Sequence, residues 1–450
     1  MTGLEIALIA FGLMLLAIFL RLPIGLAMGL TGFFGVWYVL GNPNAPLSQL
    51  KTLSYDTFSS YSLSIVPLFL LMGQFATKSG MSAALFEAAN DWLGHRKGGV
   101  AMAAVGACAG FGAVCGSSLA TASTMGQVAL PEMRKRGYSD ALSTGVLAAG
   151  GTLGILIPPS IILVIYAILT EQNIVKMFIA ALVPGILAAL GYMLTVAIYV
   201  RIRPDSATTA DRVPYGHRFL TLLKIWPVVL IFGLVMGGIA ADWNWAKPGI
   251  QALFTPTEGA AVGAVATGFY GIVTGGLNFK TFMQSVLAAA QSTAMIFFIV
   301  LGAQMFNSFL AFTQAPQDLA QWVVSQNMAP LVVLSIMLVA YLIFGCVMDS
   351  LSMILLTIPI FYPIVEVMDF GLSPEDAGIW FGILALIVVE VGLITPPVGM
   401  NLFIINSMAR DIPMAQTYRG VAPFVLSDLV RVVILVAFPG ITLWLVGVMF

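Results

Sequence analysis

Small hydroxyl side chains gather beside a glycine break in an otherwise apolar stretch, GFGAVCGSSLATAST, from Gly110 to Thr124. A helix that restarts after Gly116 directs its free N–H groups and partial positive charge toward the break. That end suits a carboxylate, and the exposed carbonyl groups around the break suit a hard cation. Serines and threonines also commonly bond back to their own helix. The half-helix geometry favours a binding site at Gly116, Ser117 and Ser118, with Thr121 one turn further on.

A second polar break carries a carboxylate. Asp349, Ser350 and Ser352 interrupt another apolar stretch shortly after Gly345. An ionisable residue at membrane depth is costly and usually functional, so we predict that Asp349 is a cation ligand rather than a purely structural residue. The roles of Glu258 and Glu390 stay open, because either carboxylate could instead bond to a neighbouring helix.

Two double prolines mark further breaks, at Pro158-Pro159 and Pro396-Pro397. Proline has no N–H group, so carbonyls one turn earlier lose their helical partners and can coordinate a cation. Thr152 precedes the first break, Thr395 adjoins the second, and Asn401 lies beyond it. We expect an anionic ligand to contact Ser117, Thr121, Ser352 and Asn401.

The elements that position these residues must lie in a membrane. Of the 450 residues, 60% are apolar and only 9% are charged, against about 25% charged in soluble domains. The net charge of −1 and the lack of a large basic cluster exclude nucleic-acid binding. Three cysteines inside apolar stretches and two isolated histidines indicate neither a disulfide framework nor a metal site. No cofactor is expected.

Apolar stretches of about 17 to 25 residues can cross a bilayer as helices. Ten such crossings are predicted, at residues 4–20, 24–41, 62–77, 141–169, 175–200, 220–240, 256–275, 285–312, 378–408 and 429–449. The interrupted segments 98–131 and 329–363 are too long for one crossing and too short for two, so we interpret them as re-entrant hairpins.

The basic residues support this layout. With the N-terminus outside, only Lys51, Lys176 and Lys247 of the 19 Lys and Arg residues lie outside, and all others, Arg431 among them, lie inside. Both termini are therefore expected to lie outside. The first apolar stretch is followed, not preceded, by a basic residue, so it is expected to remain in the membrane rather than act as a signal peptide.

The two halves of the chain carry matching features. The motif GILIPP, which begins at Gly154, corresponds to GLITPP, which begins at Gly392, 238 positions later. Pro184 corresponds in the same way to Pro423. We predict two inverted repeats, 1–200 and 220–450, joined by a cytoplasmic linker at 201–219. Each repeat has five crossings, one hairpin and one Pro-Pro broken helix (141–169 and 378–408). Inverted repeats with discontinuous helices are typical of secondary transporters.

The motifs FGAVCGSSLATAST, LGILIPPS, TPTEGAA, GCVMDSLSMILLTIPIFYPI and EVGLITPPVGMNLFI together resemble the large membrane subunit of tripartite ATP-independent periplasmic (TRAP) transporters. The resemblance covers residues 5–449. It implies a bacterial inner-membrane elevator that takes up organic acids such as dicarboxylates, sialic acid or keto acids, driven by sodium. It also implies two partners, a separate small four-helix membrane subunit and a periplasmic binding protein. Sodium ligands are then implied at Gly116, Ser117, Ser118 and Thr152, and at Asp349 and Thr395. Ser350 is expected to complete the oxygen shell around a sodium ion at Asp349.

Three other classes of function are alternatives to this one. A stand-alone sodium–carboxylate symporter or antiporter shares the hairpins but needs no partners. A non-transporting scaffold or receptor subunit would not need polar hairpin tips. An enzyme is disfavoured, since no nucleophile–base pair and no ATP-binding motif occur in the sequence.

Overall fold

The computed structural model describes residues 2–240 and 253–450, and these residues fold into α-helices joined by short turns. The first half contains α1 (Gly3–Phe19), α2 (Ile24–Leu40), α3 (Asn44–Ser59), η1 (Ser62–Ser64), α4 (Ile65–Lys78), α5 (Met81–Leu93), α6 (Gly99–Cys115), α7 (Ser118–Lys135), α8 (Asp140–Leu156), α9 (Ile161–Leu169), α10 (Ile174–Ile202) and η2 (Pro204–Ser206). The second half contains α11 (Tyr215–Lys224), α12 (Trp226–Ile239), α13 (Pro256–Val273), α14 (Phe279–Thr313), α15 (Ala315–Ser325), α16 (Pro330–Gly345), α17 (Ser350–Val367), α18 (Pro374–Gly392), α19 (Met400–Met408), α20 (Met414–Ala437) and α21 (Gly440–Met449).

Four described helices, α10, α14, α17 and α20, are by themselves long and apolar enough to cross a membrane. Three bent pairs raise the number to seven, namely α3 with α4 (55°), α8 with α9 (46°) and α11 with α12 (46°). The chain is therefore an all-α, multi-pass membrane protein, as predicted. The number of ten crossings stays a prediction.

Both predicted hairpins have two helical arms. The first is α6 and α7, separated by Gly116 and Ser117; the second is α16 and α17, separated by residues 346–349. The two arms pack against each other in each case. Gly116 ends α6 in the left-handed conformation (φ +65°), which glycine adopts without steric cost.

The two double prolines each interrupt a helix. α8 gives way to α9 around Pro158-Pro159, and α18 gives way to α19 around Pro396-Pro397; both proline–proline bonds are cis. The second arm of each broken helix packs against the opposite half of the chain: α9 contacts α17 and α18, and α19 contacts α7 and α8. The four discontinuous elements thereby form one body, the central block, made of α6–α9 and α16–α19.

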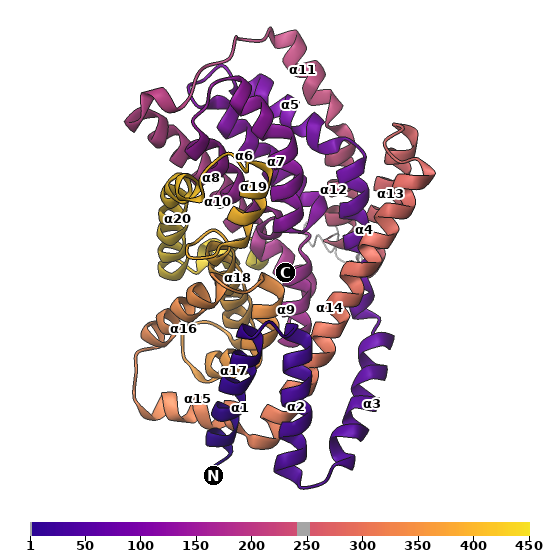
Figure 1. Cartoon of the computed structure of the whole chain (residues 1–450), viewed down its shortest axis with the longest axis vertical. Helices are drawn as coiled ribbons and strands as arrows, with labels where there is room; N and C mark the ends of the chain where they lie inside the picture. The colour runs from indigo at the N-terminus through magenta and orange to yellow at the C-terminus, as the bar shows by residue number, and fades with distance from the viewer. Residues whose placement is uncertain (1, 241–252) are drawn as a thin grey trace.

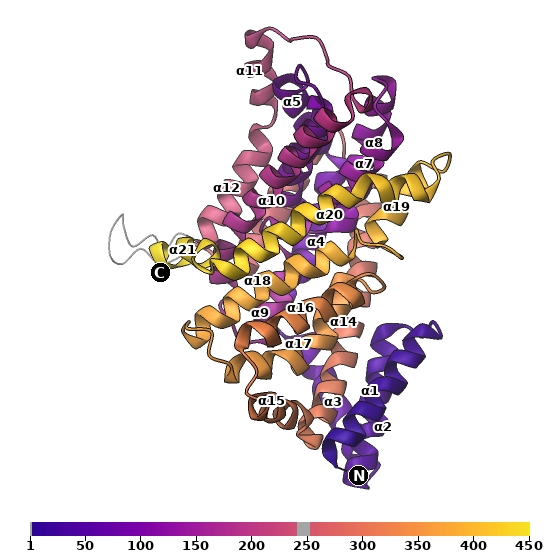
Figure 2. The same cartoon turned by 90° about the vertical axis from the view of Figure 1, so that its left-hand side faces the viewer.

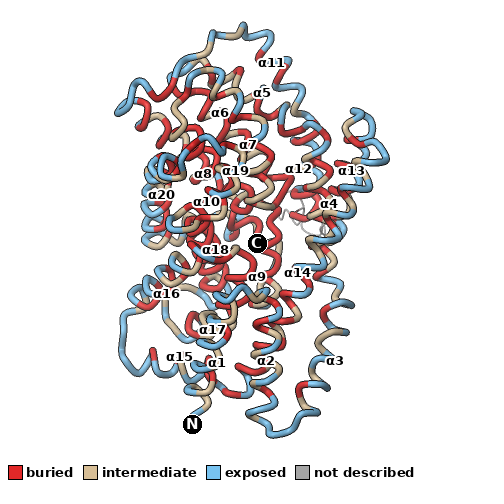
Figure 3. Tube along the Cα trace, viewed as in Figure 1, coloured by how far each residue is buried: buried red, intermediate tan, exposed pale blue. Residues whose placement is uncertain are grey.

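The most deeply buried helices of the molecule belong to the central block. α8 and α18 are buried along nearly their whole length, which fits helices that are apolar on all sides. Figure 1 shows the block on one side of the molecule and α2–α4 with α12–α14 on the other, and Figure 3 shows buried residues concentrated in helices of the block such as α8, α9 and α18. The long helix α14 packs along α2 and α4.

Matching glycines pack each hairpin against its own broken helix. A Cβ on Gly112 would lie 2.7 Å from the Cα of Gly154, and a Cβ on Gly392 would lie 2.5 Å from the Cα of Gly345. The halves also share their order of elements from α6 to α10 and from α16 to α20. The inversion of the repeats and their boundaries remain predictions.

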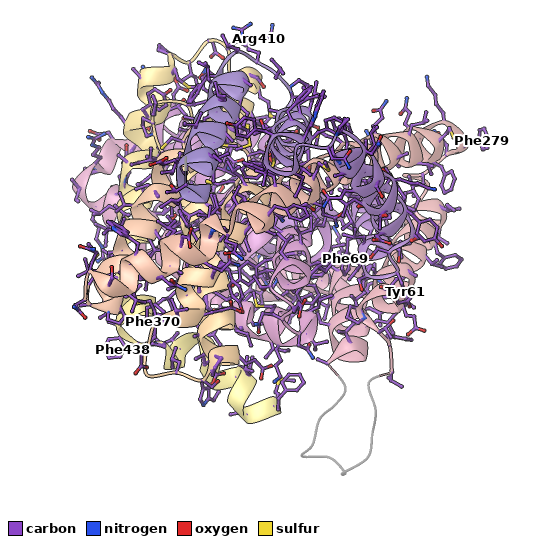
Figure 4. All side chains as sticks on the ribbon, turned by 90° about the horizontal axis from the view of Figure 1, so that it is seen from below. Tyr61, Phe69, Phe279, Phe370, Arg410 and Phe438 are labelled. Carbon is purple, nitrogen blue, oxygen red and sulfur yellow. The ribbon has the colours of Figure 1, made fainter. Side chains whose placement is uncertain are left out.

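The labelled residues of Figure 4 allow the predicted sides of the membrane to be compared with the structure. In Figure 4, Arg410 and Phe279 lie toward one side of the molecule, and Tyr61, Phe370 and Phe438 lie toward the opposite side. Arg410 and Phe279 adjoin segments expected inside, and Tyr61 and Phe370 adjoin segments expected outside, whereas Phe438 falls within the predicted crossing 429–449.

The structure corrects two expectations. The last crossing is not 429–449, because α20 ends at Ala437 and Pro439 precedes a separate helix, α21. Arg431 consequently lies within α20, where it is 7% exposed, rather than in an inside loop. Lys247 lies outside the described residues.

Candidate functional site

A cavity of about 290 Å³ lies between the two hairpin tips and the helices α4 and α14. Its polar lining comes from both tips and both flanking helices: Gly116, Ser117, Ser118, Asp349, Ser350, Gln74 and Ser292. The rest of the lining is mostly apolar, and none of the described lining residues is basic. A carboxylate and several hydroxyls thus meet at the boundary between the central block and its flanking helices.

The first tip presents the start of α7. Ser117 is the N-cap of α7, and its hydroxyl accepts a hydrogen bond from the Ala120 N–H at 3.4 Å. Ser118, the first residue of α7, is 1% exposed, and its hydroxyl has no hydrogen-bond partner in the described part of the chain. A buried hydroxyl without a partner is costly, so this one is available to a ligand.

The second tip presents the start of α17 in the same way. Asp349 is the N-cap: its Oδ2 accepts from the Ser352 N–H at 3.0 Å, and its Oδ1 accepts from the Ser352 hydroxyl. Ser350 is the first residue of α17 and lines the cavity beside Asp349. Ser117 and Asp349 therefore occupy equivalent positions at the two tips, as do Ser118 and Ser350.

Glu390, whose role the sequence left open, lies directly behind the tips. It is 0% exposed, and its Oε1 accepts a hydrogen bond from the Ser350 hydroxyl at 2.7 Å. Its Oε2 has no partner among the described residues. Glu258 lies elsewhere and caps α13, with its Oε2 accepting from the Thr255 N–H at 2.8 Å.

The two threonines expected as ligands do not line the cavity. Thr152 is 0% exposed, and its hydroxyl lies 2.7 Å from the Ala149 carbonyl and 2.9 Å from the Tyr192 hydroxyl. The Thr395 hydroxyl donates to the Val391 carbonyl of its own helix at 2.6 Å. Both side chains are therefore occupied by structural hydrogen bonds.

The other residues predicted to contact the ligand, Thr121, Ser352 and Asn401, are buried near the cavity but do not line it. Thr121 packs against Gly154, on which a Cβ would lie 2.3 Å from the threonine hydroxyl. The Ser352 hydroxyl donates a hydrogen bond to Asp349. The Asn401 amide reaches the Ala148 carbonyl at 3.4 Å, which ties α19 to α8.

Two groups of polar residues were not predicted from the sequence. Gln74 and Ser292 face the cavity from α4 and α14, and their only signal was a polar residue within an apolar span. Asp428 and Arg431 form a buried ion pair (2.9 Å) within α20, and Tyr192 of α10 donates to Asp428 at 2.6 Å. This network joins α8, α10 and α20 through Thr152.

At its base, the first hairpin is tied to the second broken helix. Arg134, at the end of α7, donates to Asp411, beyond α19, at 2.9 Å. This hydrogen bond lowers the pKa of the Asp411 carboxyl below its ordinary value. The contact joins the two halves on the side where Arg410 lies.

Comparison with known proteins places these features in a family. Residues 11–441 match the family described as "Tripartite ATP-independent periplasmic transporter, DctM component". The chain is 36% identical over 418 residues to the C4-dicarboxylate TRAP transporter large permease protein DctM of Pseudomonas aeruginosa, covering 93% of both chains. It is 29% identical over 439 residues to the isethionate TRAP transporter permease protein DctMQ of Oleidesulfovibrio alaskensis, covering 96% of this chain and 65% of that one.

A solved structure has a similar fold. The Alcanivorax borkumensis YdaH transporter superposes with a TM-score of 0.65 at 16% sequence identity, covering 88% of this chain and 89% of that one. At this identity the similarity concerns the fold alone.

Proposed function

The chain belongs to the DctM component family of TRAP transporters, and from that premise we propose that it is a sodium-coupled permease that takes up a small organic acid by an elevator motion. The observation that carries the proposal is the cavity in which Asp349 meets the hydroxyls of both hairpin tips. A site shared between the central block and the flanking helices α4 and α14 is the place where relative motion of the two would change access.

Sodium is the counter-charge that the cavity favours. Asp349 lines it, Glu390 lies behind it, and no described lining residue is basic. Hard cations prefer shells of carboxylate, hydroxyl and carbonyl oxygens. We assign sodium to Asp349, Ser350 and the first tip at Gly116, Ser117 and Ser118, with backbone carbonyls near Thr152 and Thr395 as the contribution of the broken helices.

The cargo is an organic anion. The N-termini of α7 and α17 direct N–H groups toward the cavity, and such helix ends attract anions. A C4-dicarboxylate and isethionate, which appear in the names of the two relatives, are both small organic anions. Ser117 and the N–H groups at the two tips are the proposed contacts, with Thr121, Ser352 and Asn401 supporting them from behind.

The same premise supplies partners and a location. Members of a tripartite family work with a small membrane subunit and a periplasmic binding protein, and the name DctMQ denotes a longer relative in which this chain spans 65% of the length. We place the chain in the bacterial inner membrane with both termini in the periplasm. The apolar surfaces of α1, α2, α12 and α13 are available to the small subunit.

The test is uptake into proteoliposomes that contain this chain, its small subunit and its binding protein. Asp349→Asn should raise the sodium concentration for half-maximal uptake by about tenfold or more, as expected for the loss of one charged ligand. Asparagine caps helices as well as aspartate does, so α17 should keep its start. Asp318→Asn, on the exposed surface of α15, is the matched control.

Unchanged sodium dependence in Asp349→Asn would contradict the assignment of this residue as a ligand. Full sodium-driven uptake without the binding protein would instead favour the stand-alone symporter.

A further inference from the structure

A second and larger cavity, of about 860 Å³, lies between α10 and α20 on the outer face of the molecule. Figure 2 shows α20 in front, beside α10, and Figure 1 shows α20 on the opposite side of the molecule from α4 and α14. The walls of this cavity are mainly apolar side chains. Several of them are exposed, namely Leu194, Ile198, Ile202, Leu426, Val430 and Ile434. We refer to this cavity as the α10–α20 groove.

The two helices that form the groove run in opposite directions. Tyr192 of α10 donates a hydrogen bond to Asp428 of α20 at 2.6 Å, so these two residues lie at the same position along the groove. At one end, Lys176 near the start of α10 lies 5.7 Å from the ring of Phe450, beyond the end of α20. The end of α10 and the start of α20 therefore meet at the other end, which brings Arg203 and Arg419 to the same rim.

Both rim arginines line the groove, and neither forms an ion pair within the described part of the chain. Arg203 is held in place by Tyr199: its Nη1 donates to the tyrosine hydroxyl at 3.2 Å, and its guanidinium stacks on the ring at 5.4 Å. Guanidinium groups recognise phosphate oxygens through paired N–H donors. The rim therefore offers two uncompensated charges suited to a phosphate.

The length of the groove along α10 matches the thickness of one leaflet of the bilayer. Arg203 lies eleven residues beyond Tyr192, or about 16 Å along the helix axis, which is about half of the ~30 Å hydrocarbon core. At that depth the groove meets the Asp428–Arg431 pair, whose side chains are only 2% and 8% exposed. Because this pair is internally neutralised, it forms the floor of the groove and not a headgroup site.

We propose that the α10–α20 groove binds a phospholipid with an anionic headgroup from the cytoplasmic leaflet. Its phosphate contacts Arg203 and Arg419, and an acyl chain lies along Ile198, Leu194 and Leu426. The rim is on the side that the basic residues predict to be cytoplasmic, where anionic lipids concentrate and each nearby arginine adds attraction. The charged rim favours a lipid over a transmembrane helix of a partner, which would leave both guanidinium groups without counter-charge.

The test uses the purified full-length chain in detergent and native mass spectrometry with added phosphatidylglycerol or phosphatidylethanolamine. The double variant R203Q/R419Q should bind phosphatidylglycerol about tenfold more weakly, given the attraction of each arginine. The control R201Q/R410Q removes the same charge at the same end from residues outside the groove, and it should bind as the parent does.

A second pair of variants tests the walls without changing charge. Leu194→Trp fills the groove, whereas Leu190→Trp places the same bulk on an exposed position of α10 outside its lining. Only Leu194→Trp should reduce lipid binding. Parent-like binding by R203Q/R419Q, or equal binding of the two lipids by the parent, would overturn the proposal. Loss of the small membrane subunit from Leu194→Trp with lipid binding unchanged would also overturn it, because a partner helix would then occupy the groove.

Discussion

Two carboxylates, Asp349 at a hairpin tip and Glu390 behind it, are placed in different surroundings. Asp349 lines the cavity and caps α17, so part of its charge is balanced by the Ser352 N–H and hydroxyl. Glu390 is fully buried and accepts one hydrogen bond, from Ser350, while its second oxygen has no partner among the described residues. A buried carboxylate with a free oxygen needs a cation or a proton to compensate its desolvation.

Glu390→Gln keeps an oxygen that can accept from Ser350 but removes the charge. We expect the sodium concentration for half-maximal uptake to rise by about tenfold, while the purified protein keeps its thermal stability. Glu366→Gln changes an exposed carboxylate at the end of α17 and is the control. If Glu390→Gln lost stability but kept the sodium dependence of the parent, the carboxylate would be structural.

At the scale of elements, glycines determine how closely each hairpin approaches its broken helix. A Cβ on Gly392 would lie 2.5 Å from the Cα of Gly345 and 2.6 Å from its carbonyl carbon. A Cβ on Gly154 would lie 2.6 Å from the Ser117 carbonyl oxygen. These neighbours are backbone atoms, which cannot rotate away as a side chain can.

Gly392→Ala and Gly154→Ala should each separate a hairpin from its partner and destabilise the protein by about 1–3 kcal/mol, as overpacking does. Thermal unfolding in detergent measures the loss, and sodium-dependent uptake should fall with it. Gly237→Ala is the matched control, because a Cβ there meets no atom of the described residues within 4 Å and α12 would gain helix propensity. Equal melting temperatures for Gly392→Ala and Gly237→Ala would show that the hairpin interface tolerates the extra methyl group.

At the scale of the whole molecule, the candidate site lies at a boundary between two bodies. Hairpin tips contribute one wall of the cavity, and α4 and α14 contribute the other. The proposed elevator moves residues 98–170 and 329–408 against the remaining helices. Within the moving part, α9 and α19 each pack on the opposite half, which favours motion of the four discontinuous elements as one body.

A covalent link across the cavity should stop this motion. Gln74 of α4 and Cys115 of α6 both line the cavity, so a Gln74→Cys variant that lacks Cys108 and Cys346 can be joined by a reducible bifunctional thiol reagent. We expect uptake to fall to background after cross-linking and to recover after reduction.

The control link joins Phe75→Cys to Phe282→Cys, because these rings stack 5.4 Å apart between α4 and α14, outside the moving part. It should leave uptake unchanged. Undiminished uptake by fully cross-linked Gln74→Cys protein would refute the elevator.

Local features of the sequence were enough to predict the membrane class and the helix breaks at Gly116, after Gly345 and at both double prolines. Long apolar stretches have no stable place in water, and glycine at Gly116 or proline at Pro158 alters the backbone wherever it stands. The end of the last crossing was missed because apolarity continues through Pro439 even though the helix does not. The buried Arg431 was missed because its partner Asp428 and the hydroxyl of Tyr192 are recognised only once α10 and α20 are paired.

The direction in which each polar side chain points was decided by the tertiary structure. Ser118 and Thr152 both stand beside a helix break, yet Ser118 lines the cavity and Thr152 bonds to Tyr192. Sequence determines that a polar group lies at a break, since that depends on neighbouring residues of the same segment. Whether the group faces a cavity or another helix depends on which helix packs against it, and those contacts join different helices, 40 positions apart for Thr152 and Tyr192 and 253 for Asn401 and Ala148.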